Sequence, residues 1–226
     1  RSRPLPRPEE QRRRSVDAYF ADGILWADDH KVLPAGQVKL PGAHNIQNCL
    51  AAIAAVRLLG VGLPPIRRAI KTFAGLPHRL EYVRRLRGVD YINSSMTTNP
   101  AAGARSLEAV ATSGGGVGRG ARGVVLIAGG REKALPTTEY VRAMRKYASW
   151  VLLVGESSTR LAHELDDLGF RRYDVLPDLK SALAAARAKA RDGDAVLFAP
   201  GFASFDQFRD FEARGEAFRR EVASLD

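Results

Sequence analysis

The chain has 226 residues, of which 45% are hydrophobic and 8% aromatic, a composition typical of a folded globular protein and sufficient for one large domain or two smaller ones. No apolar run approaches the roughly 20 residues of a membrane helix, so we expect no membrane partner. The net charge is +10, but the arginines are spread along the chain and no basic stretch is interleaved with aromatic residues, so we expect a phosphate-bearing small molecule rather than a nucleic acid.

The first segment, "RSRPLPRPEEQRRR", is basic and lacks both an initiator methionine and the apolar core of a signal peptide. We therefore expect a chain cut from a longer protein. The single cysteine, Cys49, excludes an intrachain disulfide and is typical of a reducing compartment. Because Cys49 lies within "NCLAAIAAVRLL", we expect it to be a buried apolar side chain rather than a nucleophile.

The first half of the predicted elements forms a small domain. Residues 17–40 combine short apolar runs with turn signals, which predicts two or three short antiparallel strands. Apolar residues at steps of three and four predict a helix over 44–59, and a second helix is expected over 64–73. The proline-marked joint "AGLPHRLE" follows. We place the domain boundary there, between a domain over 1–75 and another over 76–226.

Beyond the joint, apolar strands alternate with helices. Continuous apolar runs such as "VVLIAGG" and "WVLLVG" are typical of strands that are buried on both faces. The pattern therefore predicts an α/β fold with a mostly parallel sheet covered by helices on both faces. The predicted strands are 88–93, 123–130, 150–155, 173–177 and 194–200, and the predicted helices are 100–111 (capped by Asn99), 137–148, 157–168, 178–191 and 205–222.

Several catalytic motifs are missing from the sequence. The segment "GRGARG" at 118–123 has dinucleotide-binding spacing, but it precedes a strand instead of opening a helix, so we expect a surface loop. The chain has no G-x-x-x-x-G-K-[ST] phosphate loop and no G-x-S-x-G elbow. The four histidines lack metal-ligand spacing, so no metal site is expected.

Polar side chains follow three of the predicted strands, where a parallel sheet binds its ligands. Hydroxyls at 94–98 follow the first of these strands, Lys133 follows the second, and Ser204 follows the last. Helix N-termini at two of these places favour a carboxylate or phosphate. Each feature also has a simpler interpretation: turn chemistry at 94–98, a solvated Lys133, and a capping box formed by Ser204 with Gln207.

Five stretches resemble the Mur ligases, in the order found in that family. They are "LPGAHNIQNCLAAIAA", "FAGLPHRLEYV", "GVDYINSSMTTNP", "VVLIAGGREK" and "APGFASFDQFRDFEARGEAF". The last is similar to the branch of the family that adds D-glutamate. The resemblance runs from about residue 40 to 222. It implies the end of a central ATPase domain, followed by a complete Rossmann-like C-terminal domain that binds the amino acid; the phosphate loop would lie upstream of Arg1.

The resemblance also implies a reaction. In this branch, ATP with Mg²⁺ phosphorylates the carboxylate of UDP-N-acetylmuramoyl-L-alanine, and the amine of D-glutamate attacks the acyl phosphate. The products are an amide, ADP and phosphate, as a step of peptidoglycan-precursor and cell-wall synthesis. The resemblance further implies a cytoplasmic monomer. Because ATP and Mg²⁺ would be bound mostly upstream, we expect the isolated chain to be inactive.

The site residues of the Mur ligases can be assigned to matching positions of this sequence, which departs from the family pattern in two places. The usual Asp-Ser-Lys reads Ser94-Ser95-Met96 here, and Ala134 replaces the glycine that commonly follows the loop lysine. These departures leave room for a non-catalytic binding module or a diverged paralogue, and a folylpolyglutamate synthase is a further alternative. The resemblance implies nucleotide contacts from Asn45, Asn48 and Arg79, and D-glutamate contacts from Thr98, Lys133, Ser204 and the backbone of Phe211.

Overall fold

The computed structural model describes residues 17–40, 43–73, 75–112 and 121–226, and the glycine-rich segment 118–123 therefore lies partly outside the described residues. The chain divides into two compact units, Arg1–Ala74 and Gly75–Asp226.

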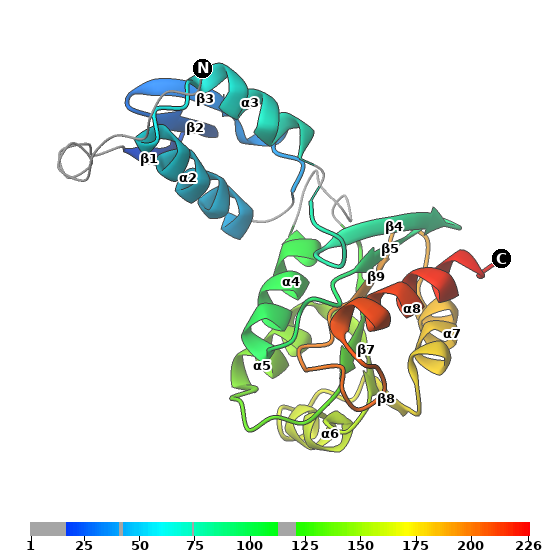
Figure 1. Cartoon of the computed structure of the whole chain (residues 1–226). Coiled ribbons are helices and arrows are strands. Elements are labelled where there is room, and N and C mark those ends of the chain that lie inside the picture. Colours follow the sequence, from blue (N-terminus) through cyan, green and yellow to red (C-terminus); the bar gives the residue numbers. More distant parts are fainter. Residues whose placement is uncertain (1–16, 41–42, 74, 113–120) are drawn as a thin grey trace. The chain divides into compact units, whose positions relative to one another are not determined.

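The first unit is a three-stranded antiparallel sheet with helices packed on it (Figure 1). The expected strands and both helices of this part are confirmed. A small core holds the sheet to the helices, and it includes Leu25 and Leu33 from the strands with Ile53 and Ile66 from the helices. The elements are β1 (Ala18–Ala21), β2 (Ile24–Ala27), β3 (His30–Pro34), the 3-10 helix η1 (Ala35–Gln37), α2 (Ala43–Leu58) and α3 (Leu63–Thr72).

The second unit is built on a six-stranded sheet with the order β4-β5-β9-β6-β7-β8. All strand pairs in it are parallel except β4 with β5. The three strands β5, β9 and β6 lie side by side in the middle of the sheet, so their carboxyl ends meet at one edge. The strands are β4 (Glu81–Leu86), β5 (Val89–Asn93), β6 (Val124–Gly129), β7 (Ala148–Val154), β8 (Tyr173–Leu176) and β9 (Ala195–Phe198).

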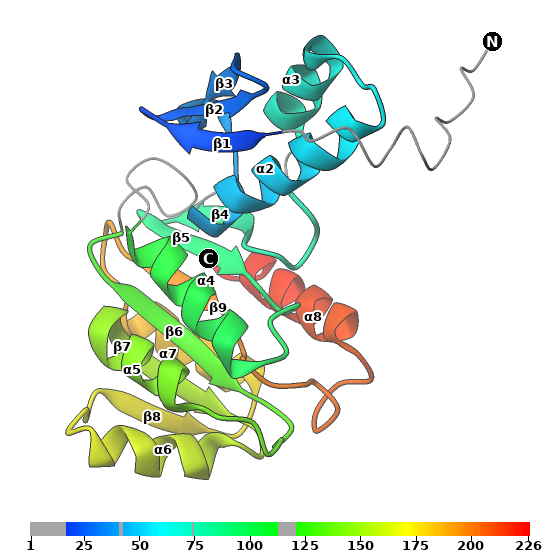
Figure 2. The same ribbon diagram turned by 90° about the vertical axis from the view of Figure 1, so that its left-hand side faces the viewer.

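Helices cover both faces of this sheet. In Figure 2, α4 and α5 lie in front of the strands and α7 lies behind them. One core packs Leu107 and Met144 against the first face, and a second core packs Leu183 and Phe218 against the other. The predicted α/β class with a mostly parallel sheet is therefore confirmed. The helices are α4 (Pro100–Thr112), α5 (Thr138–Tyr147), α6 (Ser158–Asp167), α7 (Leu179–Lys189) and α8 (Phe211–Ala223).

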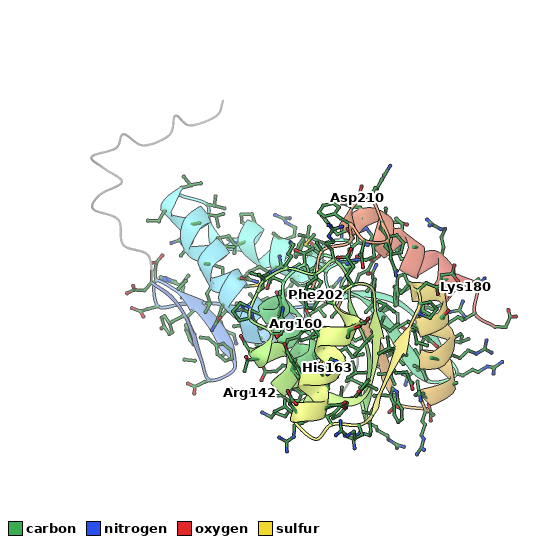
Figure 3. All side chains as sticks on the ribbon, turned by 90° about the horizontal axis from the view of Figure 1, so that it is seen from below. Arg142, Arg160, His163, Lys180, Phe202 and Asp210 are labelled. Carbon is green, nitrogen blue, oxygen red and sulfur yellow. The ribbon has the colours of Figure 1, made fainter. Side chains whose placement is uncertain are left out.

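Two elements differ from the sequence prediction. β4 was not predicted, because its partly buried sequence, EYVRRL, has charged residues in place of a continuous apolar run. The last helix begins at Phe211 and not near residue 205. Asp210 caps this helix, since its carboxylate accepts a hydrogen bond from the Ala213 amide at 2.6 Å (Figure 3). Within the described residues, none of the helices combines the length and apolar character that crossing a membrane would take.

Candidate functional site at the carboxyl edge of the sheet

The loops that follow β5, β9 and β6 are bonded to one another through their backbones. The Gly201 amide donates to the Thr97 carbonyl at 3.0 Å, which joins the loop after β9 to the loop after β5. The Arg131 amide donates to the Ala203 carbonyl at 2.9 Å, which joins the loop after β6 to the loop after β9. The three loops that carry the predicted site residues therefore form one connected surface.

The loop after β5 combines turn bonding with a helix N-terminus. The hydroxyls of Ser94 and Thr97 lie 2.9 Å apart, and both are buried. The Asn99 side chain accepts a hydrogen bond from the Ala102 amide at 2.8 Å, which confirms Asn99 as the cap of α4. Thr98 lies between the turn and this cap and is half-buried. The turn chemistry expected at 94–98 is thus present, and it places Thr98 at the mouth of α4.

The loop after β6 holds Lys133 exposed to solvent. Gly130 makes the loop's close approach to the β9 loop possible, because it has a φ of +147° and a Cβ there would collide with the Ala203 carbonyl. Arg160 on α6 fixes the other side of the loop (Figure 3). It pairs with the Glu132 carboxylate at 2.9 Å and donates to the Leu135 carbonyl at 3.0 Å. The loop after β6 is therefore held in place on both sides, and it carries the exposed Lys133 side chain.

The capping role predicted for Ser204 is wrong. The helix that it was expected to cap begins at Phe211, and Asp210 occupies the cap position. Ser204 instead opens a turn, in which its backbone carbonyl accepts hydrogen bonds from the amides of Gln207 and Phe208 at 3.1 and 2.8 Å. The Gln207 side chain donates to the Pro177 carbonyl and forms no capping box. The Ser204 side chain is buried at the carboxyl edge.

Phe211, whose backbone was expected to contact the amino acid, is tied to the loop after β5. Its carbonyl accepts a hydrogen bond from the Ser95 hydroxyl at 2.8 Å. The structure thus brings together the segments of Thr98, Lys133, Ser204 and Phe211. Their role in binding D-glutamate stays a prediction.

Arg214 is a feature of this edge that the sequence analysis missed. It is 3% exposed, and its guanidinium donates to the Ser95 hydroxyl, the Ser95 carbonyl and the Phe202 carbonyl at 3.1, 2.9 and 3.0 Å. Burial lowers its pKa to about 10. A signal was available, because Arg214 lies three and four residues from Phe211 and Phe218 on the apolar stripe of the last helix.

The predicted nucleotide contacts belong to different units. Asn45 and Asn48 lie one turn apart on α2 in the first unit, where the Asn48 amide donates to the Asn45 side-chain oxygen at 3.2 Å. Arg79 belongs to the second unit and is exposed. Their nucleotide role stays a prediction.

In the parts of the chain that the structure describes, no group of three or more His, Cys, Asp or Glu side chains could hold a metal ion. Mg²⁺ usually keeps several waters and takes one or two carboxylates together with substrate phosphates. The described side chains do not form a closed metal cage, and we assign none of them to Mg²⁺.

Comparison with known proteins identifies the family. Residues 78–202 match the Mur ligase, glutamate ligase domain. The chain is 38% identical over 209 residues to the UDP-N-acetylmuramoylalanine–D-glutamate ligase of Thermosynechococcus vestitus, which covers 92% of the chain and 44% of that protein. It is 40% identical over 203 residues to the ligase of the same name from Gloeobacter violaceus, covering 89% and 44%. The chain thus spans less than half the length of these relatives.

Solved structures with the same fold come from two groups of ligases. The UDP-N-acetylmuramate-alanine ligase of Thermotoga maritima has a TM-score of 0.62 at 20% identity, covering 83% of the chain and 39% of that protein. The Mycobacterium tuberculosis folylpolyglutamate synthase complexed with ADP has a TM-score of 0.63 at 16% identity, covering 94% and 48%. At these identities the likeness supports the fold alone. The domain match and the sequence identities show that this chain belongs to the Mur ligase family.

Proposed function

We propose that the protein of this chain joins D-glutamate to UDP-N-acetylmuramoyl-L-alanine by an ATP-dependent amide ligation in peptidoglycan-precursor synthesis. The observation that carries the proposal is sequence identity of 38–40%, over about nine-tenths of the chain, to relatives named for this reaction. The folylpolyglutamate synthases share the fold, but at 16% identity they do not support that function. The proposal includes the cytoplasmic, monomeric state implied by the resemblance.

In the proposed reaction, this chain binds and orients D-glutamate. The Lys133 ammonium attracts a carboxylate, and the mouth of α4 beside Thr98 adds the positive end of a helix dipole. Ser204 and the backbone of Phe211 complete the proposed contacts. The bound amine attacks the acyl carbon, a C–N bond forms, the bond to phosphate oxygen breaks, and the amine releases a proton. Correct placement of the amine is the contribution of these residues to the rate.

The two units have separate proposed roles. We assign residues 76–226 to the amino-acid-binding domain and residues 1–75 to the end of the central ATP-binding domain. Support comes from the division of the chain between Ala74 and Gly75 and from the domain match over 78–202. ATP supplies the phosphoryl group that activates the carboxylate, with Mg²⁺ as its counterion. The proposed nucleotide contacts of this chain are Asn45, Asn48 and Arg79.

The test is direct binding of D-glutamate to the chain. Amide resonances of the 226-residue chain are followed by NMR as D-glutamate is added, with L-glutamate and D-alanine at equal ionic strength as controls. We expect saturable shifts at Thr98, Lys133, Ser204 and Phe211 with D-glutamate, and weaker shifts with both controls. Absence of saturable shifts at these positions, or equal response to all three ligands, would contradict the proposal.

A second candidate, a binding module without ligase activity, is favoured by one observation. Ser94 and Met96 stand where the family usually has an acidic residue and a lysine, and the buried Ser94 hydroxyl bonds to Thr97. Both candidates bind D-glutamate, so turnover separates them. ADP formation by the natural gene product that requires both UDP-N-acetylmuramoyl-L-alanine and D-glutamate supports the ligase, and D-glutamate binding without such turnover supports the module.

A further inference from the structure

Arg214 is a buried cation whose contacts are neutral. Its three hydrogen-bond acceptors are the hydroxyl and carbonyl of Ser95 and the carbonyl of Phe202. None of the ion pairs found between described residues involves Arg214. The Asp206 carboxylate, which acts on it over a longer distance, accepts a hydrogen bond from the Glu156 amide. Burying a charge without a close counterion is costly, so this arrangement calls for a function.

We propose that Arg214 is a positioning residue of the D-glutamate site, holding its loops in place and supplying a buried positive charge beneath it. This inference rests on the function proposed above. It concerns a residue outside the predicted contact set of Thr98, Lys133, Ser204 and Phe211.

The hydrogen bonds of Arg214 reach the segments that carry the predicted contacts. Ser95 belongs to the loop that leads to Thr98, and Phe202 belongs to the loop that leads to Ser204. The Ser95 hydroxyl accepts from Arg214 and donates in turn to the Phe211 carbonyl.

The loop that carries Lys133 is connected to Arg214 indirectly, through a backbone hydrogen bond. The Ala203 carbonyl, next to Phe202, accepts from the Arg131 amide in the loop that carries Lys133. One guanidinium therefore sets the relative positions of all three loops and the start of α8. A planar, forked donor suits this task better than the single ammonium of lysine.

The charge of Arg214 serves the same site. Its pKa, lowered to about 10 by burial, still leaves the guanidinium protonated near neutral pH. Lys133 is exposed, so solvent and salt screen its charge, whereas a buried charge is screened far less. An anionic amino acid bound at this edge supplies negative charge where the described residues leave Arg214 without a close counterion.

The experiment compares variants of the 226-residue chain in the NMR titration with D-glutamate. Arg214→Met removes both the positive charge and the N–H donors of the guanidinium. Arg214→Lys restores the charge but not the planar set of donors. Arg84→Met is the matched control, because Arg84 also donates to two backbone carbonyls, those of Ala223 and Leu225, but at the opposite end of α8. All titrations are run well below the melting temperature of each variant, with folding checked by circular dichroism.

We expect Arg214→Met to raise the Kd for D-glutamate by about 10- to 150-fold, the upper part of the range for groups coupled through one hydrogen-bond network. Arg214→Lys should recover part of the affinity, and Arg84→Met should leave the Kd within about twofold even where it lowers stability. A folded Arg214→Met chain with the Kd of the original chain would overturn the inference. So would equal weakening by Arg214→Met and Arg84→Met.

A second variant keeps the inference testable if Arg214→Met fails to fold. Ser95→Ala keeps the arginine but removes its Nε contact and the bond to the Phe211 carbonyl. We expect a folded chain with a Kd raised several-fold, and an unchanged Kd would refute the role of Arg214. Failure of the original chain to bind D-glutamate is a distinguishable outcome. It would contradict the proposed function itself, and this inference with it, whereas an unchanged Kd in the variants contradicts only the inference.

Discussion

At the scale of single residues, Lys133 is the predicted contact with a full positive charge at the surface of the site. We expect Lys133→Met to raise the Kd for D-glutamate by about 10- to 150-fold, because a hydrogen bond to a charged group contributes about 1.5–3 kcal/mol. The free energy of unfolding should barely change, since the side chain is exposed. The NMR titration measures the Kd, and Lys146→Met, which removes an exposed lysine from the end of α5, is the control. Equal binding by both variants would remove Lys133 from the site.

Ser204 gives a second prediction, which follows from the corrected position of the helix. Had Ser204 been a cap, aspartate would have replaced it at no cost. The Ser204 side chain is 2% exposed, so Ser204→Asp should bury a carboxylate and destabilise the chain by about 2 kcal/mol or more. Urea unfolding measures the loss, with Ser204→Ala as the smaller-effect control. An aspartate variant as stable as the original chain would show that this position has access to water.

At the scale of elements, the start of α8 depends on Asp210. We expect Asp210→Ala to lower the free energy of unfolding by about 1 kcal/mol, because the Ala213 amide loses its side-chain acceptor. Asp210→Asn should keep most of the stability, since asparagine caps about as well. Urea unfolding of both variants provides the measurement, and an alanine variant that loses nothing would show that the cap bond contributes nothing in solution.

The sequence predicted most strands and helices, but it missed the edge strand β4 and the start of the last helix. Continuous apolar runs such as the one in β6 identify buried parallel strands without any knowledge of their neighbours. β4 escaped because its sequence, EYVRRL, contains three charged residues and no continuous apolar run, and its identity depends on pairing with β5, a tertiary contact. Ser204 and Asp210 both precede apolar residues, and local spacing did not decide which of the two opens the helix. Arg214 escaped because its partners, Ser95 and Phe202, come from distant loops.

At the scale of the whole molecule, the two units differ in core size. The buried core described for the first unit has six residues, whereas the two cores of the second unit have 23 and 14. We expect residues 75–226 to fold as a separate chain and its sheet amides to exchange hydrogen more slowly than those of residues 17–73 in the full chain. Hydrogen exchange measured by mass spectrometry tests both points. Equal protection in the two units would contradict the expected difference.

A further prediction concerns turnover by these 226 residues alone. Because the sequence contains no phosphate-cradling G-x-x-x-x-G-K-[ST] loop, we expect no release of phosphate from ATP, even with UDP-N-acetylmuramoyl-L-alanine, D-glutamate and Mg²⁺ supplied. A coupled phosphate assay checks this, with D-glutamate binding by the same sample as the control for folding. Phosphate release that depends on both substrates would contradict the prediction.

The backbone hydrogen bond between Arg131 and Ala203 has a consequence for the kinetics of D-glutamate binding. It joins the loop that carries Lys133 to the loop that carries Ser204. The hydrogen bond between Gly201 and Thr97 joins that second loop to the segment before α4. These hydrogen bonds couple the positions of the three loops, so we expect the surface that meets the amino acid to be assembled before the encounter. Association of D-glutamate with this unit should then follow a single exponential whose rate rises linearly with ligand concentration, without the plateau that a slow loop closure imposes.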